Sequence, residues 1–133
     1  MTNMKPGNAK MPISNNKILL IEDEGELCLL LNLILDGQGL GVEHVKSIMD
    51  ANAYLEKRLP ALVMLDNRLP DGFGVDYLMV LKSKYPWIKV VLMTGVDMAV
   101  ADVAFDNGAD AFLSKPFTKS ALIDTIDMLL YPN

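Results

Sequence analysis

The chain has 133 residues, 51% of them hydrophobic, with 12 basic and 17 acidic side chains and a formal net charge of -5. A chain of this length and apolar content can bury its own core as one domain, which excludes an intrinsically disordered protein. The acidic balance argues against direct nucleic-acid binding, which needs basic surfaces, and no apolar run is long enough to span a membrane.

The first fifteen residues predict a flexible tail, because Asn, Pro, Gly and Ser are frequent there, and the domain is expected over residues 16–133. The tail lacks the apolar segment of a secretory signal. Cys28 is the only cysteine, so no disulfide can form within the chain, and a reducing, cytoplasmic location is expected. Its side chain is either a reactive thiol or a small core residue, and core packing is the favoured interpretation.

Short apolar runs alternate with helical patterns along the domain. Strands are predicted over residues 17–21, 42–46, 61–66, 88–94 and 110–114. Helices are predicted over residues 24–36, 47–58, 74–84, 97–107 and 118–130. Several strands are continuously apolar, which is typical of a parallel sheet covered by helices on both faces. Five βα units joined by right-handed crossovers predict a doubly wound α/β fold.

Polar side chains stand at the ends of the predicted strands, where open α/β sheets bind their ligands. Glu22 and Asp23 follow the first strand, and Asp66 ends the third. Thr94 ends the fourth strand, and Lys115 follows the fifth. Three converging carboxylates need a cation to stay ionised, and Mg²⁺ suits a site of few carboxylates, water and phosphate oxygens. A carboxylate beside Mg²⁺, an ammonium group and a hydroxyl can attack a phosphoryl group.

Each of these residues also has an ordinary structural explanation. The two acids after the first strand can precede a helix, where negative charge is favoured. Asp66 can be a turn residue at the end of its strand. Either Thr94 or Asp97 can cap the fourth helix, and Lys115 can be a solvated loop residue. Coincidence nevertheless explains the whole set poorly, because complementary groups recur at the same end of successive strands.

Four motifs in this order, LLIEDE, LVMLDNRLPDGFG, VVLMTG and NGADAFLSKPF, resemble the receiver domain of bacterial two-component response regulators over residues 16–131. The resemblance implies a flavodoxin-like (β/α)5 fold with strand order 2-1-3-4-5. It implies that Asp66 accepts a phosphoryl group from the phosphohistidine of a sensor histidine kinase or a histidine phosphotransfer protein. The cofactor implied is Mg²⁺, held by Asp23, Asp66 and the backbone carbonyl of Arg68, with Glu22 acting through water.

The resemblance also assigns roles to residues around the acceptor. Lys115 is expected to pair with a phosphoryl oxygen, and its bond to Pro116 is expected to be cis. Thr94 and Phe112 match a switch pair, in which the hydroxyl moves to the phosphoryl group and the ring turns inward. The surface of the fourth helix, fifth strand and fifth helix would then bind a downstream protein target. Arg68 and Val96 lie near the path of attacking water, with no predicted sign for their effect on dephosphorylation.

Two other functions are considered. A pseudo-receiver would keep the fold without the chemistry, but all the implied site residues are present. A phosphatase of the haloacid dehalogenase type would place a general-acid aspartate two residues after the nucleophile, where this chain has Arg68. The leading interpretation is therefore a signalling module that catalyses only its own phosphorylation and dephosphorylation, not an enzyme that acts on a metabolite.

Three further features bear on partners. His44 is interpreted as structural, because the phosphodonor histidine belongs to the partner. The segment LCLLLNLIL, residues 27–35, is apolar on more faces than a surface helix needs, so its exposed part is a candidate docking surface for the kinase. The fourth helix has no basic residue, so a charge-paired dimer of the winged-helix class is not expected. The chain is expected to be a stand-alone receiver or a piece of a longer regulator or hybrid kinase.

Overall fold

The computed structural model describes residues 17–95 and 99–132. The predicted tail over residues 1–15, the domain start at residue 16, and the roles considered for Val96 and Asp97 lie outside these described residues. They stay predictions.

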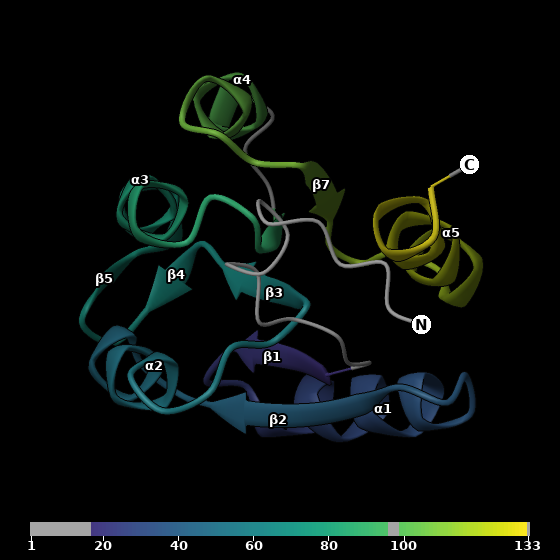
Figure 1. The fold of residues 1–133 in the computed structure, drawn as a ribbon. Coiled ribbons are helices and arrows are strands. Elements are labelled where there is room, and N and C mark those ends of the chain that lie inside the picture. Colours follow the sequence, from purple (N-terminus) through teal and green to yellow (C-terminus); the bar gives the residue numbers. More distant parts are fainter. Residues whose placement is uncertain (1–16, 96–98, 133) are drawn as a thin grey trace, which may run out of the picture.

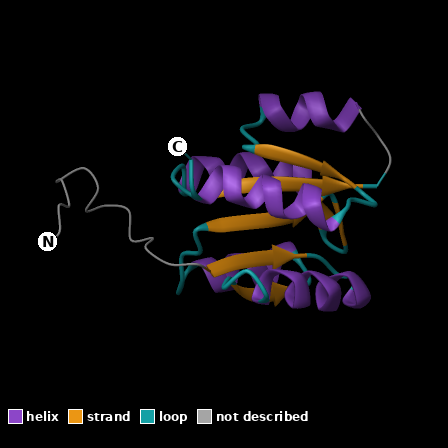
Figure 2. Cartoon of the chain, turned by 90° about the vertical axis from the view of Figure 1, so that its right-hand side faces the viewer, coloured by secondary structure: helices purple, strands orange, loops and turns teal. Residues whose placement is uncertain are grey.

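A five-stranded parallel sheet forms the centre of the molecule, and its strands run in one direction in Figure 2. Its strands, in chain order, are β1 (Lys17–Ile21), β2 (Gly41–Val45), β3 (Leu62–Asp66), β6 (Lys89–Thr94) and β7 (Ala111–Ser114). They lie side by side in the order β2-β1-β3-β6-β7. Counted along the sheet strands alone, this is the order 2-1-3-4-5, so the predicted doubly wound fold is confirmed.

Five helices cover the two faces of this sheet. They are α1 (Gly25–Asp36), α2 (Ile48–Leu55), α3 (Gly74–Lys84), α4 (Ala99–Asp106) and α5 (Lys119–Leu130). Figure 1 shows α1 and α5 on one face and α2, α3 and α4 on the other. Ser47 and Thr118 accept the backbone N–H groups of Asp50 and Ala121, so these two hydroxyls cap α2 and α5. The predicted helices are confirmed, although α2 ends at Leu55 rather than at residue 58.

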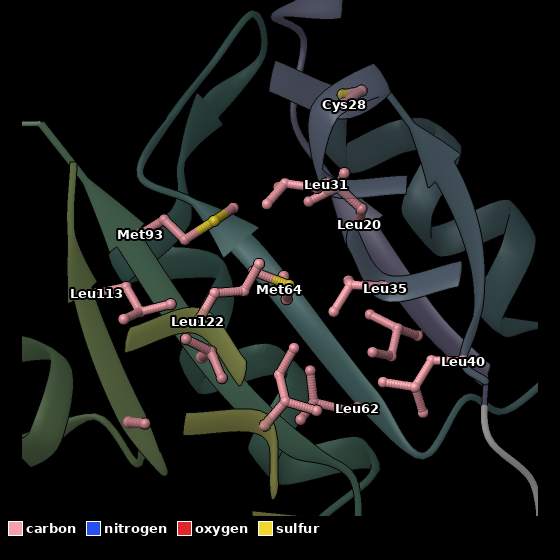
Figure 3. Close-up of a cluster of buried hydrophobic side chains, with 14 residues drawn as sticks. Leu20, Cys28, Leu31, Leu35, Leu40, Leu62, Met64, Met93, Leu113 and Leu122 are labelled. Carbon is pink, nitrogen blue, oxygen red and sulfur yellow. The ribbon is translucent and has the colours of Figure 1, made fainter. Parts of the chain in front are cut away.

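Alternate residues of the central strands enter two separate hydrophobic cores, as the two-residue period of a strand requires. In β1 and β3, the residues Ile18, Leu20, Leu62 and Met64 face α1 and α5, whereas Leu19, Ile21, Val63 and Leu65 face α2, α3 and α4. Figure 3 shows the first core, in which strand residues such as Leu20 and Met64 meet Leu31 and Leu35 of α1 and Leu122 of α5. Each fully buried side chain of this kind contributes about 1.5–3 kcal/mol. Cys28 is buried in the same core, which confirms the core-packing interpretation.

The segment between β3 and α3 is a small hairpin. Two-residue strands, β4 (Arg68–Leu69) and β5 (Gly72–Phe73), pair antiparallel around a turn at Pro70 and Asp71. The sequence analysis predicts no strands in this segment, yet the residues on each side of the turn are paired. Within the described ranges, no helix is long and apolar enough to cross a membrane.

Candidate functional site

The sheet brings the predicted site residues to its carboxyl edge. Glu22 and Asp23 directly follow β1, and Asp66 is the last residue of β3. Thr94 is the last residue of β6, and Lys115 directly follows β7. Because β1, β3, β6 and β7 are consecutive neighbours in the sheet, these ends meet at one place, as the sequence predicts.

Three carboxylates form a compact cluster at this edge. Glu22, Asp23 and Asp66 each offer one oxygen, and these oxygens lie within 4.8 Å of one another. Glu22 and Asp66 are buried, whereas Asp23 is exposed to solvent. Carboxylates this close repel one another, and hard oxygen donors open to water on one side suit Mg²⁺. The residues present therefore fit the predicted metal.

Lys115 is the cation that pairs with the buried acids. Its Nζ donates to Glu22 Oε1 at 2.7 Å and to Asp66 Oδ1 at 3.0 Å. Burial opposes the charge of Lys115, but the two carboxylates outweigh burial and raise the pKa of the ammonium group. The geometry excludes the alternative of a solvated loop lysine. The peptide bond between Lys115 and Pro116 is cis, as predicted.

Glu22 experiences opposing electrostatic effects. Burial raises the pKa of its carboxyl group, and the negative charge of Asp66 adds to this shift, while the bond from Lys115 acts against it. The net effect is a raised pKa for Glu22, so its ionised form is less stable in the folded protein than in water. An additional cation at the cluster would favour the ionised form.

A cavity of about 510 Å³ opens at Asp66. Its lining is formed by Asp66, Asn67, Arg68, Phe73, Val75, Thr94, Gly95, Val100 and Lys115. Thr94 is buried, whereas Arg68 is exposed. The cavity therefore presents a carboxylate, a hydroxyl and an ammonium group to one small ligand, and an apolar wall from β5, α3 and α4 completes it.

Phe112 lies apart from this lining. It pairs in register with Leu92 on the neighbouring strand, is half-buried, and packs at the margin of the core beneath α2, α3 and α4. The predicted switch partners Thr94 and Phe112 thus stand on adjacent strands, β6 and β7. In this conformation only Thr94 borders the cavity at Asp66.

Asn67 is a site residue that the sequence reasoning missed. Its side-chain oxygen accepts the N–H of Val75 at 3.0 Å, and its backbone oxygen accepts the N–H of Gly74 at 2.7 Å. Its own N–H donates to Met93 O at 2.9 Å. Asn67 is buried, and it joins the end of β3 to both β6 and the start of α3. Local sequence carries little signal for this role, because Asn67 lies six residues before Phe73, the N-cap residue of α3.

Asp71 also has a contact that the sequence did not reveal. It lies in the turn between β4 and β5, and its two carboxylate oxygens accept the N–H groups of Ile48 and Met49 at 2.9 and 3.0 Å. These are the first two residues of α2. The two backbone hydrogen bonds lower the pKa of Asp71. No local pattern predicts this contact, because it joins two segments far apart in the sequence.

The side chains of His44 and Cys28 contact each other and the backbone oxygen of Glu22. His44 Nε2 is 2.9 Å from Cys28 Sγ and forms a hydrogen bond with the backbone oxygen of Glu22. This position agrees with the structural interpretation of His44. Burial, followed by the charges of Glu22 and Glu24, raises the pKa of Cys28 to about 11, so the thiol is protonated at neutral pH. The reactive-thiol alternative is therefore not supported.

The acidic cluster predicts a specific response to Mg²⁺. Without metal, Asp23→Asn is expected to raise the melting temperature by about 2–5 °C, because it removes one of three repelling charges. Mg²⁺ is expected to raise the melting temperature of the unmodified protein and to have a much smaller effect on the variant. Thermal unfolding followed by circular dichroism, in EDTA and in Mg²⁺, measures both effects. Asp76→Asn, on the exposed face of α3, is the control and should keep the full response. If Mg²⁺ raised the melting temperature of Asp23→Asn as much as that of the unmodified protein, Asp23 would not be a metal ligand.

Comparison with known proteins gives the same family from sequence. The family model described as "Response regulator receiver domain" matches residues 18–127. The photosynthetic apparatus regulatory protein RegA of Cereibacter sphaeroides is 32% identical over 77% of this chain and 56% of its own length. The KDP operon transcriptional regulatory protein KdpE of Escherichia coli is 32% identical over 75% of this chain and 44% of its own length. The chain thus spans about half the length of these curated relatives.

Comparison with solved structures points to the same family and fold. The receiver domain of NtrX from Brucella abortus has a TM-score of 0.82 and 29% identity, covering 87% of this chain and 99% of that one. A two-component response regulator from Clostridium difficile has a TM-score of 0.84 over 89% of this chain and 98% of that one; at 22% identity, it supports the fold alone. Since the family model covers most of the chain, the protein belongs to the receiver domains of two-component response regulators.

Proposed function

We propose that Asp66 accepts a phosphoryl group from the phosphohistidine of a sensor histidine kinase or a histidine phosphotransfer protein. The observation that carries this proposal is the placement of Asp66, 3.0 Å from Lys115 Nζ and within 4.8 Å of two other acids, in a cavity that Thr94 also lines. We also propose a cytoplasmic location, since the only cysteine is an unpaired, buried thiol.

The transfer is a substitution at phosphorus. A carboxylate oxygen of Asp66 forms the new P–O bond as the P–N bond to the donor imidazole breaks, and the departing imidazole nitrogen takes up a proton from solvent. Lys115 leaves its present partner Asp66 Oδ1 to pair with a phosphoryl oxygen, and the Thr94 hydroxyl donates a hydrogen bond to another. The product is an acyl phosphate on Asp66.

The acidic cluster, together with the resemblance to receiver domains, supplies the proposed metal ligands. Asp23, Asp66 and the backbone carbonyl of Arg68 would hold Mg²⁺ directly, and Glu22 would act through water. When bound, Mg²⁺ supplies positive charge that offsets the charge developing on the phosphoryl oxygens. Glu22, the most deeply buried of these acids, also keeps Lys115 in position through its 2.7 Å ion pair.

Mass spectrometry tests this proposal directly. Incubation with a small phosphodonor such as acetyl phosphate and Mg²⁺ is expected to add one phosphoryl group. The gain should disappear with Asp66→Asn or with EDTA, and should persist with Asp76→Asn, which changes an exposed acid of α3. Failure of the unmodified protein to gain mass would reject the proposal and favour a pseudo-receiver.

The output surface is proposed to be the α4-β7-α5 face, controlled by Thr94 and Phe112. Phosphorylation would draw the Thr94 hydroxyl toward the phosphoryl group and let the half-buried Phe112 ring turn inward. The exposed charged residues of α4 and α5 are mostly acidic, namely Asp102, Asp106, Asp124 and Asp127, with Lys119 as the basic one. This charge supports a protein target rather than nucleic acid.

The phosphodonor is proposed to dock on the groove between α1 and the start of α5. This groove, about 710 Å³ in volume, is lined mainly by apolar side chains, including Leu27, Leu30, Ile34, Phe117 and Leu122, and it reaches Lys115. Leu29, Leu30 and Leu33 expose more than half of their surface on the same helix. An apolar surface that ends beside the acceptor is well placed to hold a partner's phosphohistidine near Asp66.

A charge introduced into this groove is expected to separate docking from chemistry. Leu30→Lys should slow phosphoryl transfer from a kinase that phosphorylates the unmodified protein by about tenfold or more, because it places a charge in the contact. Labelling by acetyl phosphate, which needs no docking, should not change. Met79→Lys on α3 is the matched control, since Met79 is exposed to a similar degree and lies outside the groove. Equal kinase transfer rates in the two variants would reject the groove as the docking site.

A further inference from the structure

The hairpin that follows Asp66 is attached to the start of α2. Asp71 lies in the turn of this hairpin, and its two carboxylate oxygens separately accept the N–H groups of Ile48 and Met49. The next residue, Gly72, packs so closely on α2 that an added Cβ would lie 2.9 Å from Ile48 Cδ1. The hairpin itself has only two pairs of facing residues, so these contacts with α2 contribute much of what holds its turn.

The start of α2 is also connected to the acidic cluster. The N–H of Glu22 donates to the oxygen of Val45 at 3.0 Å, at the end of β2. From Val45 the chain passes through Lys46 and Ser47 directly into α2. The segment after β1 and the hairpin after β3 are therefore both hydrogen-bonded to residues 45–49, in addition to their connection through the sheet.

The Asp71 contact satisfies the chemical needs of both partners. The first N–H groups of a helix have no partner within the helix, and a carboxylate there is stabilised by the helix dipole. Ser47 satisfies the N–H of Asp50 in the same turn, so the serine and Asp71 cap different donors of α2. Of these two caps, Asp71 is the one that also joins the helix to the hairpin.

We propose that Asp71 is a positioning residue for the metal site, which fixes the Arg68 carbonyl relative to Glu22 and Asp23 by holding the hairpin on α2. This inference rests on the proposed function, because it takes the Arg68 carbonyl as a Mg²⁺ ligand. Arg68 stands in β4, three residues before Asp71, so movement of the turn is transmitted to its carbonyl. Loss of the Asp71 contact therefore weakens metal binding without removing a ligand.

Calorimetric titration with Mg²⁺ tests the inference on the unphosphorylated chain. Asp71→Ala is expected to raise the Mg²⁺ dissociation constant about tenfold, the effect typical of losing a group that orients metal ligands. With acetyl phosphate, the variant should be slow at low Mg²⁺ and recover the normal rate at saturating Mg²⁺. Asp71→Asn keeps one acceptor oxygen, so its Mg²⁺ dissociation constant should fall between those of the unmodified protein and Asp71→Ala.

Ser47→Ala is the matched control. It removes a cap from the same end of α2 and leaves the hairpin attached, so its Mg²⁺ dissociation constant should stay within about twofold of the original. Circular dichroism verifies that every variant is folded at the titration temperature. An unchanged constant in Asp71→Ala, or an equal increase in Ser47→Ala, would overturn the inference while leaving the proposed function intact. Absence of any Mg²⁺ binding by the unmodified protein would instead overturn both.

Discussion

Replacing Lys115 with methionine is expected to destabilise the folded protein by about 2–3 kcal/mol and to slow phosphoryl acceptance at least about 100-fold. The first effect arises because Lys115 is within 2.7 Å of Glu22 and 3.0 Å of Asp66. Methionine leaves the fully buried Glu22 without its cation. The second effect arises because the ammonium group is lost from the cavity where charge develops during transfer.

The stability loss in Lys115→Met should depend on pH. The folded-state pKa of Glu22 already lies above its ordinary value of 4.5, and it rises further without Lys115. A carboxyl group with a raised folded-state pKa stabilises the fold below its unfolded pKa and loses that contribution as pH rises through the folded pKa. The difference between the two proteins should therefore be largest near neutral pH and shrink as pH falls toward 4.5.

Urea unfolding at pH 7 and pH 5, without metal, measures this difference. Lys115→Arg is the control for charge: it should restore much of the stability but little of the transfer rate, since guanidinium geometry differs from that of ammonium. A stability difference that stays constant or grows on acidification would show that Glu22 is not the group left unpaired.

Gly74→Ala is expected to cost about 2–3 kcal/mol, although alanine is the better helix former by about 1 kcal/mol. Gly74 is the first residue of α3, and a Cβ there would lie 2.3 Å from the backbone oxygen of Asp66 and 3.0 Å from Asn67 Cα. These are backbone atoms, so no side-chain rotation relieves the overlap. The end of β3 must move, and the acceptor carboxylate moves with it.

Gly25→Ala supplies the matched control, because Gly25 is likewise the first residue of a helix, α1, and an added Cβ meets nothing within 4 Å. It should be neutral or stabilising by up to about 1 kcal/mol. Urea unfolding and the acetyl phosphate labelling rate give both readouts. If Gly74→Ala matched Gly25→Ala in stability and rate, the close approach of α3 to Asp66 would be unnecessary for either property.

Much of the fold could be predicted from the sequence because the sheet is buried on both faces. β1 and β3 are apolar almost throughout, and each run ends where a polar side chain begins. The hairpin at residues 68–73 could not be recognised, because two-residue strands are too short to show a period. The end of α2 was misplaced, since helix ends depend on tertiary contacts that local sequence does not contain.

The contacts of the candidate site likewise fall into two groups, those that could be predicted from the sequence and those that could not. Glu22, Asp66 and Lys115 could be brought together in advance, because parallel strands deliver their carboxyl ends to one edge. The contact from Asp71 to Ile48 could not, because it spans 23 residues between a turn and a helix start. Contacts of this kind depend on how the loops are placed on the finished fold.

The burial of Cys28 makes its thiol a natural probe of local opening at α1. The sulfur is 7% exposed, its pKa is raised to about 11, and it is the only thiol in the chain. A thiol-modifying reagent is therefore expected to react slowly with the folded protein and faster when α1 lifts from the sheet, so the labelling rate should increase with such openings. Because α1 also lines the groove beside Lys115, one chemical label introduced without mutation can record how firmly a bound partner holds this helix in place.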